Sequence, residues 1–201
     1  CKMAKDKGFK EVIVATNGYG FQRKNGGLEW TKKVYEMGLD TLYLQFDGIN
    51  NATLEKVRGI KNLMEYKMRV VENCRKVGLS SINLVATVVK GITDIEIGNI
   101  IQFALDNIDV VRGITFQPVS LCGRITVEEM EDLRITNADV IKEIERQTGG
   151  AISMDDAWYP LTTIVEFGRA IAYLADVEPV ELTCHLDGGF ATYMVTEPDS
   201  N

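Results

Sequence analysis

The 201-residue sequence predicts an α/β protein built around a mainly parallel sheet. One module occurs three times, at 5–18, 35–48 and 75–91, and each copy runs from a helix end through a glycine and an apolar strand to a polar turn. Segments with helical spacing of apolar residues separate the strands. Strands joined by helical crossovers pair in parallel, so the repeat predicts consecutive βα units.

The first module starts in a short charged helix and continues into a strand that ends at Asn17-Gly18. Gly8, and its counterparts Gly38 and Gly78, stand where the end of a helix favours left-handed backbone. This first strand is expected at an edge of the sheet, where unpaired backbone invites pairing with another chain. A short helix over 28–37 follows it.

The second strand, over 41–48, is expected at the centre of the fold. Side chains alternate along a strand, which places Leu42, Leu44 and Phe46 on one face. Tyr43, Gln45 and Asp47 then share the other face. One face is apolar enough to pack on helices, and the other becomes more polar toward its carboxyl end.

The remaining elements follow from the same patterns. A helix over 61–77 precedes the third strand, and a helix over 95–105 begins after the capping residues Thr93 and Asp94. The fourth strand covers 113–120, and Thr126 and Glu129 have the spacing of a capping box at the next helix. Beyond it the sequence predicts helices over 136–149 and 162–174 and short strands over 151–154, 180–184 and 191–195.

Composition narrows the class of protein. The length predicts a single domain over 1–201, with βα units over 1–150 and a C-terminal extension over 151–196. A net charge of -7 argues against a nucleic-acid partner. No apolar run reaches the ~20 residues of a transmembrane segment, and a cytoplasmic location is expected. The cysteines are far apart and predict reduced thiols without a zinc site, at Cys1, Cys74, Cys122 and Cys184.

Polar residues collect at the carboxyl ends of the strands, which form the ligand face of a βα sheet. Asn17, Asp47, Lys90 and Ser120 end the four main strands, and polar side chains also occur within them at Gln45, Asn83, Thr87 and Gln117. They predict a wet or ligand-holding interior. Alternatively, they hydrogen-bond one another, and the Asx-Gly pairs are simple turns.

Four other residues have two interpretations each. Lys90 is either a Schiff-base lysine or a solvated one, and the solvated interpretation is preferred. Arg124 either clamps an anionic ligand beside Gly123 or forms a surface ion pair. His185 is expected to be structural because no partner for a general base is evident, and Cys184 is expected to be a buried thiol.

A family resemblance appears when the motifs are read in order. The stretches Ala15-Thr-Asn-Gly18, Leu44-Gln-Phe-Asp-Gly48, Val88-Val-Lys-Gly-Ile-Thr-Asp94 and Phe116-Gln-Pro-Val-Ser-Leu-Cys-Gly-Arg124 resemble radical S-adenosylmethionine (SAM) enzymes. Within them, the sequence is similar to the archaeal-type subfamily that contains tetraether lipid synthase and a pterin-associated methyltransferase. Each motif is weak alone, and their order and spacing are specific together.

The resemblance implies a partial TIM-like (β/α)6 barrel and, in the parent protein, a [4Fe-4S] cluster and S-adenosylmethionine. The C-x-x-x-C-x-x-C and Gly-Gly-Glu motifs of the family are not in this sequence, and no cysteine follows His185. The chain is therefore expected to be a fragment without the first two βα units, and a cluster is not expected in it. No catalytic residue and no metal ligand is assigned. The positions that match cavity-lining or cofactor-binding positions of the family are Asn17, Gln45, Asp47, Thr87, Gln117 and Arg124.

Three functional hypotheses remain open. In the first, the chain is part of an iron–sulfur oxidoreductase that generates a 5′-deoxyadenosyl radical for hydrogen abstraction from a C–H bond, and it is inactive alone. Its substrate is a small molecule or a lipid. The second is a non-redox TIM-barrel lyase that uses Lys90. The third is a non-catalytic half-barrel that self-associates or joins another chain through its open edge.

Overall fold

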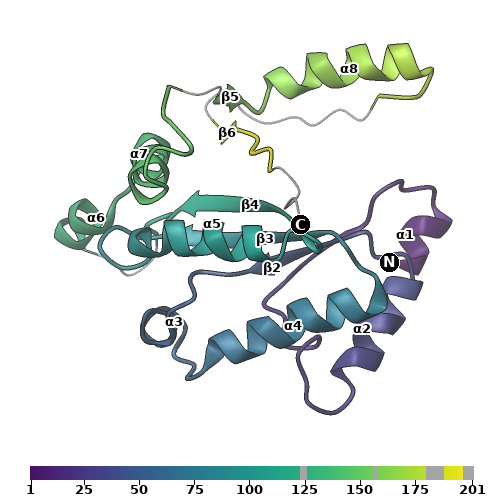
Figure 1. Cartoon of the computed structure of the whole chain (residues 1–201), viewed down its shortest axis with the longest axis horizontal. Helices are drawn as coiled ribbons and strands as arrows, with labels where there is room; N and C mark the ends of the chain where they lie inside the picture. The colour runs from purple at the N-terminus through teal and green to yellow at the C-terminus, as the bar shows by residue number, and fades with distance from the viewer. Residues whose placement is uncertain (123–125, 156–157, 180–187, 197–201) are drawn as a thin grey trace, which may run out of the picture. The chain divides into compact units, whose positions relative to one another are not determined.

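The computed structural model describes residues 1–122, 126–155, 158–179 and 188–196 (Figure 1). The chain divides into two compact units, Cys1–Thr136 and Asn137–Asn201. None of the helices in the described ranges is long and apolar enough to cross a membrane.

The first unit contains a four-stranded sheet in the order β1-β2-β3-β4, with every neighbouring pair parallel. The predicted α/β fold with a parallel sheet is confirmed. β1 lies at one edge, as expected, and β2 lies between β1 and β3. Pairing of the β1 edge with another chain stays a prediction. The strands are β1 (Ile13–Thr16), β2 (Thr41–Gln45), β3 (Ile82–Val88) and β4 (Val111–Pro118).

The helices of this unit precede, connect or follow the strands, as the sequence pattern requires. Gly8, Gly38 and Gly78 all have positive φ, so the predicted left-handed helix ends are confirmed. The capping box of Thr126 and Glu129 also forms. The helices are α1 (Lys2–Asp6), α2 (Gly27–Glu36), α3 (Asn51–Arg58), α4 (Leu63–Val77), the 3-10 turn η1 (Asp94–Glu96), α5 (Ile97–Asp106) and α6 (Val127–Leu133).

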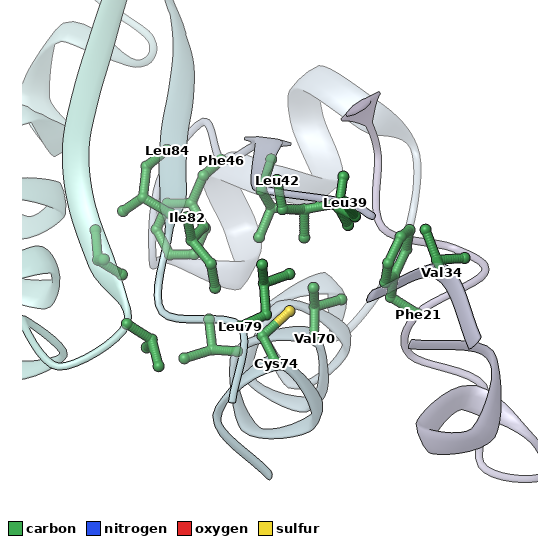
Figure 2. Close-up of a cluster of buried hydrophobic side chains, with 14 of the residues drawn as sticks. Phe21, Val34, Leu39, Leu42, Phe46, Val70, Cys74, Leu79, Ile82 and Leu84 are labelled. Atoms are coloured by element: carbon green, nitrogen blue, oxygen red, sulfur yellow. The ribbon is translucent and has the colours of Figure 1, made fainter. Parts of the chain in front are cut away.

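The hydrophobic core of the first unit lies against one face of the sheet (Figure 2). Leu42, Leu44 and Phe46 are fully buried there, which confirms the predicted alternation in β2. Val70 and Cys74 of α4 pack against the same cluster. Burying each large aliphatic side chain contributes about 1.5–3 kcal/mol relative to exposure, so this face fixes the register of the strands.

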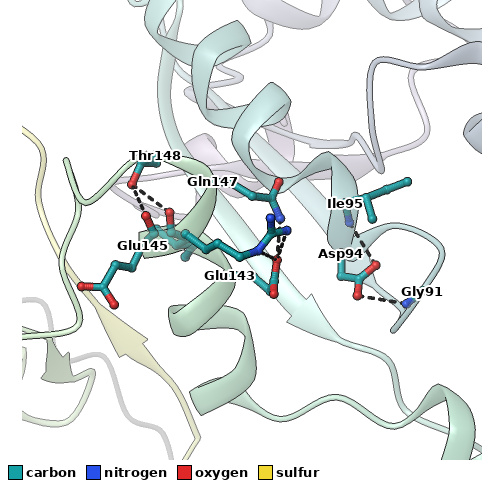
Figure 3. A network of polar contacts seen from close by, with 9 residues as sticks. Gly91, Asp94, Ile95, Glu143, Glu145, Gln147 and Thr148 are labelled. Atoms are coloured by element: carbon teal, nitrogen blue, oxygen red, sulfur yellow. Dashed lines mark hydrogen bonds and ion pairs between the residues drawn. The ribbon is translucent and has the colours of Figure 1, made fainter.

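The second unit contains α7 (Asn137–Gln147), α8 (Thr163–Ala175) and a two-stranded antiparallel ladder of β5 (Tyr159–Pro160) and β6 (Phe190–Ala191). Near the end of α7, Glu143 accepts hydrogen bonds from Arg146 and Gln147, and Figure 3 labels Glu143 and Gln147. The strand predicted over 191–195 is real only at Ala191, where it belongs to β6. The strand predicted over 180–184 falls outside the described residues.

The strand predicted over 151–154 is wrong. Two glycines with positive φ, Gly149 and Gly150, turn the chain back after α7. Thr148 then accepts a hydrogen bond from the backbone N–H of Ile152, and Glu145 accepts one from that of Met154. Local side-chain acceptors thus occupy the backbone donors that a strand would have needed for its ladder.

The turn after β1 yields a stability prediction. Gly18 has φ +87°, and a Cβ there would meet Val70 Cγ2 at 2.9 Å and Leu44 Cδ1 at 3.0 Å. We expect Gly18→Ala to lower the free energy of unfolding by about 2–4 kcal/mol, since backbone strain and overpacking add. Gly78→Ala is the matched control, with φ +82° and nothing within 4 Å of the added Cβ. Equal losses in urea denaturation of both variants would contradict the packing argument.

Candidate functional site

Polar side chains meet at the carboxyl ends of the strands, on the face of the sheet opposite the core. The register pairs Tyr43 with Asn83 and Thr87 with Gln117. The side chains of β2 and β3 on this face are half-buried, whereas those on the other face are buried against the helices. Asn83 donates a hydrogen bond to the Thr115 hydroxyl at 2.8 Å, so some of these groups do satisfy one another.

Asp47 is a buried acidic group at this edge, with 2% of its surface exposed. Its Oδ1 accepts a hydrogen bond of 3.0 Å from the backbone N–H of Thr87. The previous bond of the β2–β3 ladder runs from Phe46 N–H to Val85 O. The carboxylate therefore continues the ladder by one hydrogen bond after β2 has ended.

Arg58 neutralises that carboxylate. Its Nε lies 2.8 Å from Asp47 Oδ2 and its Nη2 lies 3.0 Å from Asp47 Oδ1. This is the bidentate geometry that a guanidinium favours with a carboxylate. α3 places Arg58 there: Asn50 caps the start of the helix by accepting from Ala52 N–H, and Gly59 ends it in left-handed backbone. The Gln45 side chain also lies against this guanidinium.

Lys67 projects from α4 toward the end of β1. Its Nζ donates a 2.7 Å hydrogen bond to the backbone oxygen of Asn17, and only 2% of the residue is exposed. Burial lowers the pKa of Lys67 to about 8 from an ordinary 10.5, because desolvation disfavours the charged amine. The negative charge of Asp47 opposes this lowering of the pKa, and the positive charge of Arg58 adds to it.

Two more buried polar residues hold the loops at this edge. Glu96 accepts a 3.2 Å hydrogen bond from Ile49 N–H, and a Cβ on Gly48 would meet its Cγ at 2.9 Å. The Thr93 hydroxyl donates to Thr87 O at 2.7 Å and accepts from the N–H of Val89. These contacts connect the end of β2 to the start of α5.

The turn after β3 is closed by a carboxylate. Figure 3 shows Asp94 accepting hydrogen bonds from the backbone N–H groups of Gly91, at 2.9 Å, and Ile95, at 3.0 Å. Thr93 and Asp94 thus close the loop through backbone donors. The side chain of Thr93 does not cap the helix that follows it.

The structure brings four of the predicted site residues to one edge: Asn17, Gln45, Asp47 and Thr87. Gln117 lies opposite Thr87 on β4, is exposed, and has no hydrogen bond from its side chain to a described residue. Arg124, Cys184 and His185 fall outside the described residues. Lys90 is exposed, as the preferred interpretation of a solvated lysine expects.

Sequence reasoning missed Arg58, Lys67 and Glu96. Arg58 had a signal, because Asn50 and Gly59 mark the two ends of a helix. Lys67 had a weaker one: it falls within the apolar stripe of the helix over 61–77. Glu96 had none, since an acidic residue in the first turn of a helix is ordinary.

The described residues offer no cluster site. Within the described ranges, no group of three or more His, Cys, Asp or Glu residues could hold a metal ion. Burial raises the pKa of the Cys74 thiol to about 12, so this sulfur is held as an unreactive thiol in the core. Polar amides and hydroxyls at the sheet edge are instead groups that suit an organic ligand.

Comparison with known proteins identifies the family of the chain. Residues 1–104 match the Radical SAM superfamily, and the match therefore spans β1, β2 and β3. The chain belongs to the radical SAM superfamily. This membership implies S-adenosylmethionine and a [4Fe-4S] cluster in the parent protein.

Two radical SAM relatives show how far the similarity extends. A 7,8-dihydro-6-hydroxymethylpterin dimethyltransferase from Methanocaldococcus jannaschii is 42% identical over 198 residues, which are 98% of this chain. A GTP 3′,8-cyclase from Rippkaea orientalis is 23% identical over 145 residues, which are 71% of this chain. The chain spans only 38% and 41% of the lengths of these relatives.

The ion pair between the buried Asp47 carboxylate and Arg58 makes a stability prediction. We expect Arg58→Ala to lower the free energy of unfolding by about 2–4 kcal/mol, because the buried carboxylate loses its counter-charge. A double-mutant cycle with Asp47→Ala should give a coupling of about 2 kcal/mol. The matched control is the surface pair of Arg75 and Asp109, also two-pronged but with the Asp109 side chain 53% exposed. Its coupling should stay below about 1 kcal/mol, and equal couplings would refute the role of burial.

Lys67 makes a prediction about pH. Its amine gives up its proton near pH 8 in the folded protein and near 10.5 when unfolded, so the unfolded state binds more protons between these values. Stability should therefore rise with pH across this window, by at most about 1.4 kcal/mol per pH unit relative to Lys67→Met. Cys74 ionises more readily in the unfolded state and lowers stability in alkali, equally in both proteins. A pH-independent difference in urea unfolding would exclude a lowered pKa of Lys67.

Proposed function

We propose that this chain lines the cofactor cavity of a radical SAM enzyme that abstracts hydrogen from a C–H bond through a 5′-deoxyadenosyl radical. One observation carries the proposal: four parallel strands bring polar side chains to one edge, within and beyond the segment that matches the superfamily. The carboxyl ends of parallel strands are the ligand face of βα folds. When bound, the cluster and S-adenosylmethionine supply the radical chemistry.

The residues of this chain would bind and orient the ligand. In this proposal, Asn17, Gln45, Thr87 and Gln117 offer amide and hydroxyl groups that suit the hydroxyls and ring nitrogens of a nucleoside. Asp47 acts through its partner Arg58, since contacts with Arg58 and Thr87 already engage both of its carboxylate oxygens. Arg124 is proposed to extend this lining from the loop after β4.

We further propose that the 201 residues alone are inactive. The sequence contains four widely spaced cysteines and no C-x-x-x-C-x-x-C motif. A cluster-binding segment of the parent protein would have to complete the site. The substrate class that we propose is a reduced pterin, because the 42% identical relative is a pterin dimethyltransferase.

The ligand proposal is tested by calorimetric titration of the chain with S-adenosylmethionine. We expect saturable binding, weakened about 3- to 10-fold in Gln117→Ala, since one hydrogen bond contributes about 0.5–1.5 kcal/mol. Gln102→Ala is the matched control, because Gln102 is exposed on α5 and, among the described residues, its side chain bonds only to Asp106. The absence of any binding by the unmutated chain would reject the proposed lining of the cavity.

The inactivity proposal needs a separate experiment. The chain is incubated anaerobically with iron and sulfide, and its iron content and absorption spectrum are measured. Substoichiometric iron and no cleavage of S-adenosylmethionine are expected. A stoichiometric [4Fe-4S] spectrum from the chain alone would show that its own cysteines hold the cluster.

A further inference from the structure

The side-chain amide of Gln45 lies against the guanidinium of Arg58. With its oxygen toward the guanidinium, that oxygen lies 2.9 Å from Nε, 2.9 Å from Nη1 and 2.5 Å from Nη2. An atom this close to all three nitrogens lies over the face of the guanidinium, whose positive charge attracts the amide oxygen and repels the amide N–H groups. Arg58 therefore decides which end of the Gln45 amide faces which way.

The amide nitrogen of Gln45 then points away from Arg58. No described residue accepts a hydrogen bond from this nitrogen. Gln45 is half-buried on the face of β2 opposite the core, where the other polar residues of the edge also lie. Its two N–H groups are thus donors available to a ligand on that face.

Arg58 is itself held firmly. Asp47 grips its guanidinium at two points, and the backbone N–H of Thr87 fixes Asp47 in turn. The Asp47 side chain is 3% exposed and the Arg58 side chain 33%, so the carboxylate is sheltered from water while the guanidinium reaches the surface. A chain of contacts therefore runs from β3 through Asp47 and Arg58 to the amide of Gln45.

We propose that Arg58 is a positioning residue that turns Gln45 into a hydrogen-bond donor toward an acceptor atom of bound S-adenosylmethionine. The inference rests on the proposed function for its ligand, whereas the orientation of the amide rests on the contacts alone. A site built this way favours an oxygen or ring nitrogen acceptor opposite Gln45. It disfavours a ligand that presents an N–H group there, because two donors would meet.

Two substitutions at Gln45 test the donor. Gln45→Glu keeps an oxygen against Arg58 and removes the N–H groups, whereas Gln45→Met removes both without adding charge. We expect S-adenosylmethionine to bind about 10-fold more weakly to each, with Gln45→Glu melting no lower than the unmutated chain. Binding of either variant as tightly as the unmutated chain would overturn the donor role, since neither can donate.

Arg58→Lys tests the positioning. A lysine keeps the charge but cannot grip Asp47 and Gln45 together. The readout is the side-chain ¹⁵N–¹H resonance of Gln45, assigned by its loss in Gln45→Glu. Without ligand, the amide should be rigid in the unmutated chain and mobile in Arg58→Lys, with Arg69→Lys as a control because Arg69 contacts Gln22 instead. An equally rigid amide in Arg58→Lys would overturn the inference.

The binding titration and the Gln45 resonance distinguish failure of the proposed function from failure of the positioning by Arg58. If the unmutated chain binds no S-adenosylmethionine, the proposed function fails. The ligand-free resonance then still decides whether Arg58 orients Gln45. If the ligand binds and shifts the Gln45 resonance in the unmutated chain but not in Arg58→Lys, the donor and its positioning are both supported.

Discussion

The buried carboxylate of Asp47 is the constraint on which the polar edge of the sheet depends. A charged group that is only 2% exposed is tolerated when it is paired and hydrogen-bonded. Arg58 supplies the counter-charge and Thr87 N–H the remaining bond. These two partners come from different elements, α3 and β3, so satisfying one carboxylate fixes the end of β2 against both. The loop after β2 then has little freedom, and Glu96 removes more by accepting from Ile49 N–H.

The apolar half of the fold could be predicted from the sequence because its cause is periodic. Leu42, Leu44 and Phe46 alternate with polar residues, and only one arrangement of a strand buries all three. The helix ends at Gly8 and Gly38 could be predicted equally well, since a positive φ at glycine is a local property of the backbone. In the second unit the same logic failed at 151–154, where the side chains of Glu145 on α7 and Thr148 just after it accept the backbone hydrogen bonds first.

The polar half could be predicted only in part. Strand alternation and parallel pairing place four polar residues at one edge, so the sequence predicted them as site residues: Asn17, Gln45, Asp47 and Thr87. Their charged partners Arg58 and Lys67 come from helices, and contacts between helices and strands carry no sequence periodicity. In the sequence, Lys67 interrupts an apolar stripe of its helix. Only the fold shows that its amine donates a 2.7 Å hydrogen bond to Asn17 O.

The two cations near Asp47, Arg58 and Lys67, differ in their electrostatic surroundings. Arg58 donates to both carboxylate oxygens of Asp47 and so stabilises its negative charge. Lys67, by contrast, is disfavoured as a cation by burial and by Arg58, and favoured by Asp47. Any anionic or acceptor group that enters beside Lys67 would add to the pull of Asp47 and raise the pKa of the amine. The protonation of Lys67 is therefore coupled to what occupies the edge, whereas the Asp47–Arg58 pair, and the amide of Gln45 that it holds, are preset before anything binds.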